Sequence, residues 1–110
     1  MADYKRYITQ TQENGNVMIS EDVVAAIAEH ALADVEGAAL LRDIKNWNKG
    51  MKIVIAEDNA VAVSINISVA YGHSVMDVAH NVQHVITSAV ENMTGVKVSE
   101  VNVNICGIAK

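Results

Sequence analysis

The chain has 110 residues, a net charge of −5, one cysteine and no proline. A single domain of this length buries roughly 65% of its unfolded surface, and no apolar run approaches the about 20 residues that cross a bilayer. No Lys or Arg lies between Lys52 and Lys97, so this half of the chain lacks the cations that neutralise nucleic-acid phosphates. The lone thiol of Cys106 excludes an internal disulfide and fits a reducing cytoplasm.

The N-terminal part of the chain predicts an arm, a short strand and a helix. Residues 1–16 are polar and predict a flexible arm, which leaves 17–110 as one α+β domain. Val17–Ile19 is a short apolar run that predicts a brief strand. Ser20 is suited to cap a helix over Glu21–Glu36, whose apolar residues recur at helical spacing until Gly37.

The segment Ala38–Gly50 fits no single element. Its basic residues gather around the one tryptophan, Trp47, and include Arg42 and Lys45. A basic segment with an aromatic side chain can bind an acidic partner or a phosphate. A solvated connection with Trp47 folded onto the core explains the same pattern.

The C-terminal half predicts a strand, a second strand, a helix and a final strand. We expect the strands at Met51–Ala56, Ala60–Tyr71 and Lys97–Cys106, and the helix from Val75 to about Met93. The capping pair Ser74 and Asp77 opens that helix. Each strand has one apolar face, so the economical fold is α+β, with two helices packed on one face of a small, mainly antiparallel sheet, approximately βαββαβ.

Four polar residues on and before the second helix raise the possibility of a metal site. His80 and His84 are four residues apart and share a helix face, and His73 and Asp77 lie within reach of them. Two histidines and a carboxylate can hold zinc, and the alternative is a set of solvated surface histidines. The stripe of valines lies on another side of the helix, which favours the solvated reading.

No catalytic constellation is recognisable. Cys106 sits near the end of a strand without a histidine beside it in sequence, and the serines have no G-x-S-x-G context. The phosphate-binding patterns G-x-x-x-x-G-K-[ST] and G-x-G-x-x-G are missing. We therefore predict a non-enzymatic protein without a cofactor.

The polar face of the predicted sheet is the remaining candidate surface. Strand alternation places Ser64, Asn66 and Ser68 on one face, and Asn102 and Asn104 on the equivalent face of the last strand. An uncharged polar face bordered by strand edges suits association with another protein. A merely solvated face is the alternative.

Six short motifs together resemble one family. They are G-N-V-x-I-S-E-D-V at Gly15–Val23, D-V-E-G at Asp34–Gly37, K-G-M-K-I at Lys49–Ile53, Y-G at Tyr71–Gly72, V-A-x-N-V-Q at Val78–Gln83 and E-N-M-T-G-x-K-V-x-E-V-N-V at Glu91–Val103. In this order and spacing they resemble the alkaline shock protein family, the envelope stress response family of Gram-positive bacteria. The resemblance extends over Gly15–Ile108, nearly the whole chain.

The resemblance implies a small non-enzymatic cytoplasmic protein linked to cell-envelope stress and homeostasis. It also implies protein partners, including a membrane-anchored one that holds some members at the membrane periphery, and self-association. It carries no catalytic residues over. Our leading hypothesis is a protein-interaction or scaffold protein that uses the polar sheet face, with no nucleic acid and no direct membrane insertion. The rivals are a metal or small-ligand protein using the histidine face, and a regulatory accessory subunit of a cytoplasmic enzyme.

Overall fold

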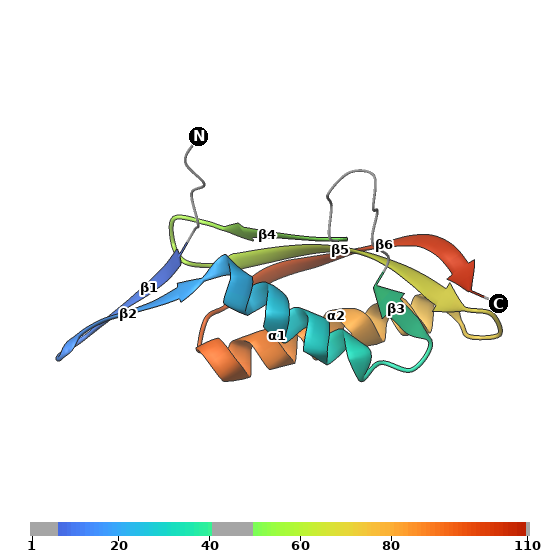
Figure 1. Ribbon diagram of the computed structural model, residues 1–110, viewed down its shortest axis with the longest axis horizontal. Coiled ribbons are helices and arrows are strands. Elements are labelled where there is room, and N and C mark those ends of the chain that lie inside the picture. Colours follow the sequence, from blue (N-terminus) through green and yellow to red (C-terminus); the bar gives the residue numbers. More distant parts are fainter. Residues whose placement is uncertain (1–6, 41–49, 110) are drawn as a thin grey trace.

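The computed structural model describes residues 7–40 and 50–109 of the chain (Figure 1). Eight elements follow one another in these ranges, and their bounds are β1 (Tyr7–Gln12), β2 (Gly15–Ser20), α1 (Glu21–Ala33), β3 (Ala38–Leu40), β4 (Met51–Ile55), β5 (Val61–Ala70), α2 (Val75–Thr94) and β6 (Val98–Ala109). The helices and the longer C-terminal strands lie where the sequence predicts them, to within a few residues. The predicted α+β class is confirmed.

The main sheet is built around β5. On one side β6 runs parallel to it over its whole length, and on the other β3 and β4 pair with it antiparallel, one after the other. Leu40 of β3 lies opposite Ile67, and Met51 of β4 lies opposite Ile65, so the two short strands occupy one edge of the sheet. The residues between them, 41–49, include the basic segment around Trp47, which lies outside the described residues.

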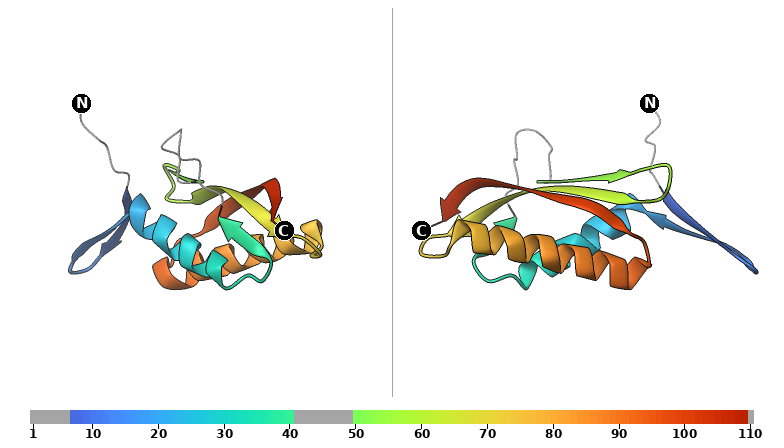
Figure 2. Two further views of the ribbon diagram at one scale, coloured as in Figure 1. Left: turned by 45° about the vertical axis from the view of Figure 1, so that its right-hand side comes forward. Right: turned by 180° about the vertical axis from the view of Figure 1, so that it is seen from behind.

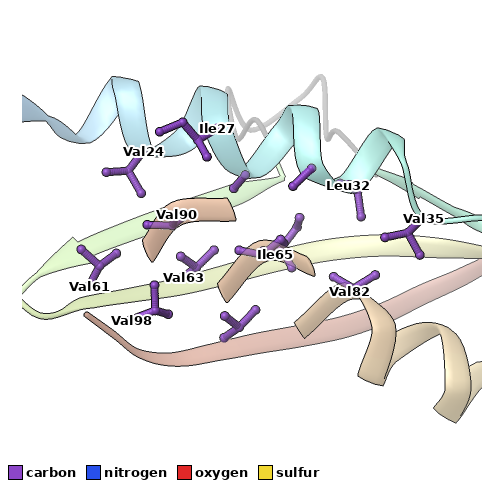
Figure 3. Close-up of a cluster of buried hydrophobic side chains, with 14 of the residues drawn as sticks. Val24, Ile27, Leu32, Val35, Val61, Val63, Ile65, Val82, Val90 and Val98 are labelled. Carbon is purple, nitrogen blue, oxygen red and sulfur yellow. The ribbon is translucent and has the colours of Figure 1, made fainter. Parts of the chain in front are cut away.

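Both helices lie on the same face of this sheet, as predicted (Figure 1). The odd-numbered residues of β5 point at the helices and are fully buried: Val61, Val63, Ile65, Ile67 and Val69. Val24 of α1 and Val82 and Val90 of α2 meet them in one apolar cluster (Figure 3). β-branched side chains fill most of this thin core because they pack closely on a pleated sheet surface.

Local signals fix the helix ends. The Ser20 hydroxyl accepts a hydrogen bond from the backbone N–H of Val23, and the Ser74 hydroxyl accepts one from Asp77. α2 ends at Thr94 and is followed by its C-cap Gly95, whose left-handed backbone (φ 72°) suits glycine. α1 ends at Ala33, one turn before the predicted Glu36, because the backbone turns there to reach Gly37 (φ 87°).

The prediction of a flexible arm over residues 1–16 is wrong for Tyr7–Gln12. These residues form β1, which pairs antiparallel with β2 through a two-residue turn at Glu13 and Asn14 and projects as a hairpin from the body (Figure 1). The hairpin is anchored at its base, where Ile8 is fully buried and the Asn59 side chain donates to the Thr9 carbonyl at 3.1 Å. Residues 1–6 lie outside the described residues.

The βαββαβ order is also wrong in detail. β2 pairs only with β1 among the described strands and forms a separate two-stranded sheet, so it does not enter the main sheet as a ferredoxin-like order requires. β6 extends beyond the predicted end at Cys106 to Ala109. A register shift after Ile67 and Ile105 lets the strand continue, with Gly107 opposite Ser68.

Candidate interaction surface

The face of the sheet that points away from the helices carries small, mostly uncharged side chains. We call it the open face, and define it by Ser64, Asn66, Ser68, Asn102 and Asn104. Ser64 lies directly opposite Asn102 and Asn66 opposite Asn104 in the β5–β6 register. The three β5 side chains are half-buried, and the two asparagines of β6 are exposed. The five residues chosen from sequence parity therefore do form one continuous surface.

Hydrogen bonds between side chains hold part of the open face in place. The Asn104 amide donates to the Asn66 side-chain oxygen at 3.0 Å, and the Asn102 amide donates to a Glu100 carboxylate oxygen at 2.9 Å. Such pairs leave further amide and hydroxyl groups pointing outward, since each asparagine side chain has two donors and one acceptor. The surface is thus rich in directional hydrogen-bonding groups and poor in charge.

The sequence reasoning missed the part of the open face that β4 contributes. Lys52 lies opposite Ser64, and Val54 lies opposite Ala62 with 42% of its surface exposed. Lys52 and Val54 alternate with Met51, Ile53 and Ile55 along the strand. This alternation could have predicted that Lys52 and Val54 point to the open face. Lys52 on one border and Glu100 on the other give the open face a charged rim.

The structure does not bring the four candidate metal ligands together. His73 and Asp77 line a depression of about 320 Å³ at the start of α2, with Asp34 and Glu36 across from them. His80 and His84 are exposed farther along α2 and do not line it. Within residues 7–40 and 50–109, no group of three or more His, Cys, Asp or Glu side chains is placed to hold a metal ion.

Cys106 lies at the register shift of β6. Its thiol is free and exposed, and its sulfur lies 3.7 Å from the Asn104 carbonyl oxygen. Among the described residues, no group of three or more His, Cys, Asp or Glu side chains includes this thiol.

A shallow apolar groove runs between the two helices on the other side of the molecule. It encloses about 500 Å³, and Val23, Ile27 and Ala31 of α1 face Ala89 and Met93 of α2 across it. Met93 is 72% exposed. Within the described residues, no helix is both long enough and apolar enough to span a membrane.

A small two-layer α+β domain with one open sheet face is the class that these observations define. The family model of the alkaline shock protein 23 family, described as having a cell envelope-related function, matches residues 9–110. The chain therefore belongs to this family. The resemblance found in the six motifs is confirmed.

Three curated relatives are similar to the chain over most of its length. An uncharacterised protein of Bacillus subtilis, YqhY, is 31% identical over 105 residues, which cover 86% of this chain and 77% of the relative. Spy1535 of Streptococcus pyogenes is 32% identical over 106 residues (89% and 82%), and YloU of Bacillus subtilis is 30% identical over 107 residues (86% and 88%). No solved structure matches.

Proposed function

We propose that the protein is a non-enzymatic interaction or scaffold protein that binds a protein partner of the cell envelope through the open face. The observation that carries this proposal is the open face itself. Two adjacent strands, β5 and β6, present serine, asparagine and alanine side chains there, and no described element covers them (Figure 1).

The distribution of charge supports the proposal. The chain carries 13 acidic and 8 basic residues, yet the described side chains of the open face are neutral except for its rim. Protein interfaces are depleted of charge at their centre and polar at their border. Lys52 and Glu100 occupy the border positions, on opposite edges of the sheet.

The family description supports the envelope part of the proposal, because the function ascribed to the family is cell envelope-related. A partner at the membrane would place the protein at the membrane periphery without a spanning segment of its own. A metal or small-ligand function finds less support, since the four candidate ligands do not converge.

Site-specific photo-crosslinking in cells tests the proposal. A photoreactive residue at Ser64, in the middle of the open face, is compared with one at His84, which is exposed on α2. We expect the Ser64 position to give a discrete adduct in the envelope fraction that the His84 position does not give. The substitution Ser68→Lys, on the same face as Ser64, is expected to abolish this adduct.

Two results would contradict the proposal. One is an identical adduct pattern from both positions, which would indicate random encounter. The other is an adduct that persists in the Ser68→Lys variant, because a charge placed within the contact costs several kilocalories per mole when it is buried without a partner. Circular dichroism of each variant confirms that the fold is intact.

A further inference from the structure

The outer edge of β6 is the longest unpaired strand edge in the described part of the chain. β6 has 12 residues and, among the described strands, pairs with β5 only, so no described strand lies along its other side. Figure 2 (right) shows β6 in red along the side of the sheet, above α2. An edge of this kind offers a row of backbone N–H and C=O groups to another strand.

The ladder shows which of these groups point outward. The Val61 N–H donates to the Lys97 carbonyl at 3.0 Å and the Tyr71 N–H donates to the Ala109 carbonyl, so odd-numbered residues of β5 bond to β6. In a parallel ladder, a β5 residue that bonds to β6 does so through the two neighbours of the β6 residue opposite it. The backbone N–H and C=O of that opposite β6 residue therefore point away from β5. Val101, Val103 and Ile105, opposite Val63, Ile65 and Ile67, therefore face outward.

The Gln83 side chain agrees with this assignment. Its amide nitrogen donates to the Val101 carbonyl oxygen at 3.0 Å, which requires that oxygen to be free of β5. Gln83 belongs to α2 and reaches the sheet edge from below. It satisfies one outward carbonyl, while no hydrogen bond found among the described residues uses the outward groups of Val103.

The usual protections of an edge strand are weak here. An edge strand is normally kept from pairing with a strand of another chain by its short length, by lysine or proline residues, or by a segment that covers it. The opposite edge has two of these features, because β3 and β4 have only 3 and 5 residues and β4 carries Lys52. β6 is long and carries one charged residue, Glu100, between Val98 and Ala109.

We propose that the β6 edge binds the β6 edge of a second copy of this chain, antiparallel, around a twofold axis at Val103. This register pairs the three outward residues, Val101, Val103 and Ile105, with the same three residues of the second copy. Val103 lies opposite the partner's Val103, and Val101 lies opposite the partner's Ile105. The register shift at Cys106 of each copy marks the two ends of the regular antiparallel pairing around this axis.

The side chains of β6 are self-complementary in this register. Asn102 lies opposite the partner's Asn104, and the two amides can exchange hydrogen bonds across a closely spaced non-hydrogen-bonded pair. Glu100 lies opposite the partner's Cys106 and not opposite another carboxylate. Two chains that each carry a net charge of −5 thus meet along a line where no like charges face each other.

Pairing joins the two main sheets into one and places the two open faces side by side. The contact is a narrow one, because it consists of strand edges and the adjoining side of α2, and narrow contacts are weak and reversible. We therefore expect a monomer–dimer equilibrium in the micromolar range. The inference does not depend on the proposed function, since an open face that binds no protein leaves the β6 edge unchanged.

Sedimentation velocity over a range of concentrations tests the pairing, with Val103→Pro as the principal variant. Proline is tolerated in an edge strand when the lost N–H points to solvent, so the variant keeps its ladder to β5. Two outward hydrogen bonds at the axis are lost, and the dissociation constant is expected to rise about 30-fold. Circular dichroism verifies the fold.

Ile53→Pro is the matched control. Ile53 is half-buried like Val103, and its N–H also points outward, but from β4 on the opposite edge. We expect this variant to dimerise like the unmodified chain. Equal loss of dimer in both variants would overturn the proposal, and so would an unmodified chain that remains monomeric up to about 1 mM.

A pair of double variants tests the register. In Asn102→Lys/Asn104→Glu each lysine faces a glutamate of the other copy, and the dimer is expected to become several-fold tighter at low salt. In Asn102→Lys/Asn104→Lys lysines face lysines, and the dimer is expected to weaken at least tenfold. Similar affinities for both double variants would contradict an axis at Val103.

Discussion

Gly37 offers the sharpest test of the packing between the end of α1 and the start of α2. Its backbone has φ +87°, and a Cβ added there would lie 2.8 Å from Nδ1 and 2.9 Å from Cγ of the His73 ring. Gly37→Ala therefore carries two costs. The left-handed backbone costs about 1–2 kcal/mol for a residue with a Cβ, and displacing the ring costs about 1 kcal/mol in lost packing.

Gly72 supplies the matched control for this prediction. It has a similar backbone (φ +97°), but nothing lies within 4 Å of a Cβ built on it. Gly72→Ala should therefore lose only the about 1–2 kcal/mol of backbone strain, and Gly37→Ala about 2–3 kcal/mol in total. Urea denaturation followed by far-ultraviolet circular dichroism measures both free energies of unfolding, with an unchanged m value as the check on comparability.

The contribution of the ring is isolated by adding His73→Ala. This second change should recover about 1 kcal/mol in the Gly37→Ala background, because the clash disappears with the imidazole. Equal destabilisation of the two glycine variants, or no recovery on removing the ring, would refute the reasoning.

Three other predictions concern the core, a helix cap and the hairpin. Ile65→Ala, at a fully buried position of β5, should lower the free energy of unfolding by about 3–4 kcal/mol in the same urea assay. Ser74→Ala removes the oxygen that accepts from the Asp77 N–H and should cost about 1 kcal/mol, whereas Ser74→Asp should restore the cap. Asn59→Gly keeps the positive φ of 68° but loses the hydrogen bond to the Thr9 carbonyl, and should speed amide exchange in β1 about tenfold with little effect on β5.

The parts of the fold that the sequence predicts well are those in which one strong pattern acts alone. β5 alternates over ten residues, from Val61 to Ala70, and every apolar residue at an odd position in it is buried. The same parity placed Ser64, Asn66 and Ser68 on the open face. Ser20 and Ser74 are good N-cap residues, so the sequence predicts where both helices begin.

The hairpin was missed because its pattern is weak. β1 reads Y-I-T-Q-T-Q, and its threonines and glutamines resemble a solvated arm as much as a strand. Its only large aliphatic residue, Ile8, is buried against the core, and that contact depends on tertiary structure. The pairing of β2 with β1 then follows from their proximity in the chain, which favours a local hairpin over entry into the main sheet.

The two binding proposals share Asn102 and Asn104, and they need variants that separate them. These asparagines belong to the open face and also stand at the β6 edge, so a change at either one can weaken both kinds of contact. Ser64 lies on the open face one strand away from that edge, and Val103 lies on the edge with its side chain toward the helices. Ser68 lies on the same strand and face as Ser64. Ser68→Lys should therefore abolish the envelope crosslink formed from position 64 without changing sedimentation, and Val103→Pro should do the reverse. A variant of either kind that affects both measurements equally would show that partner binding requires the dimer.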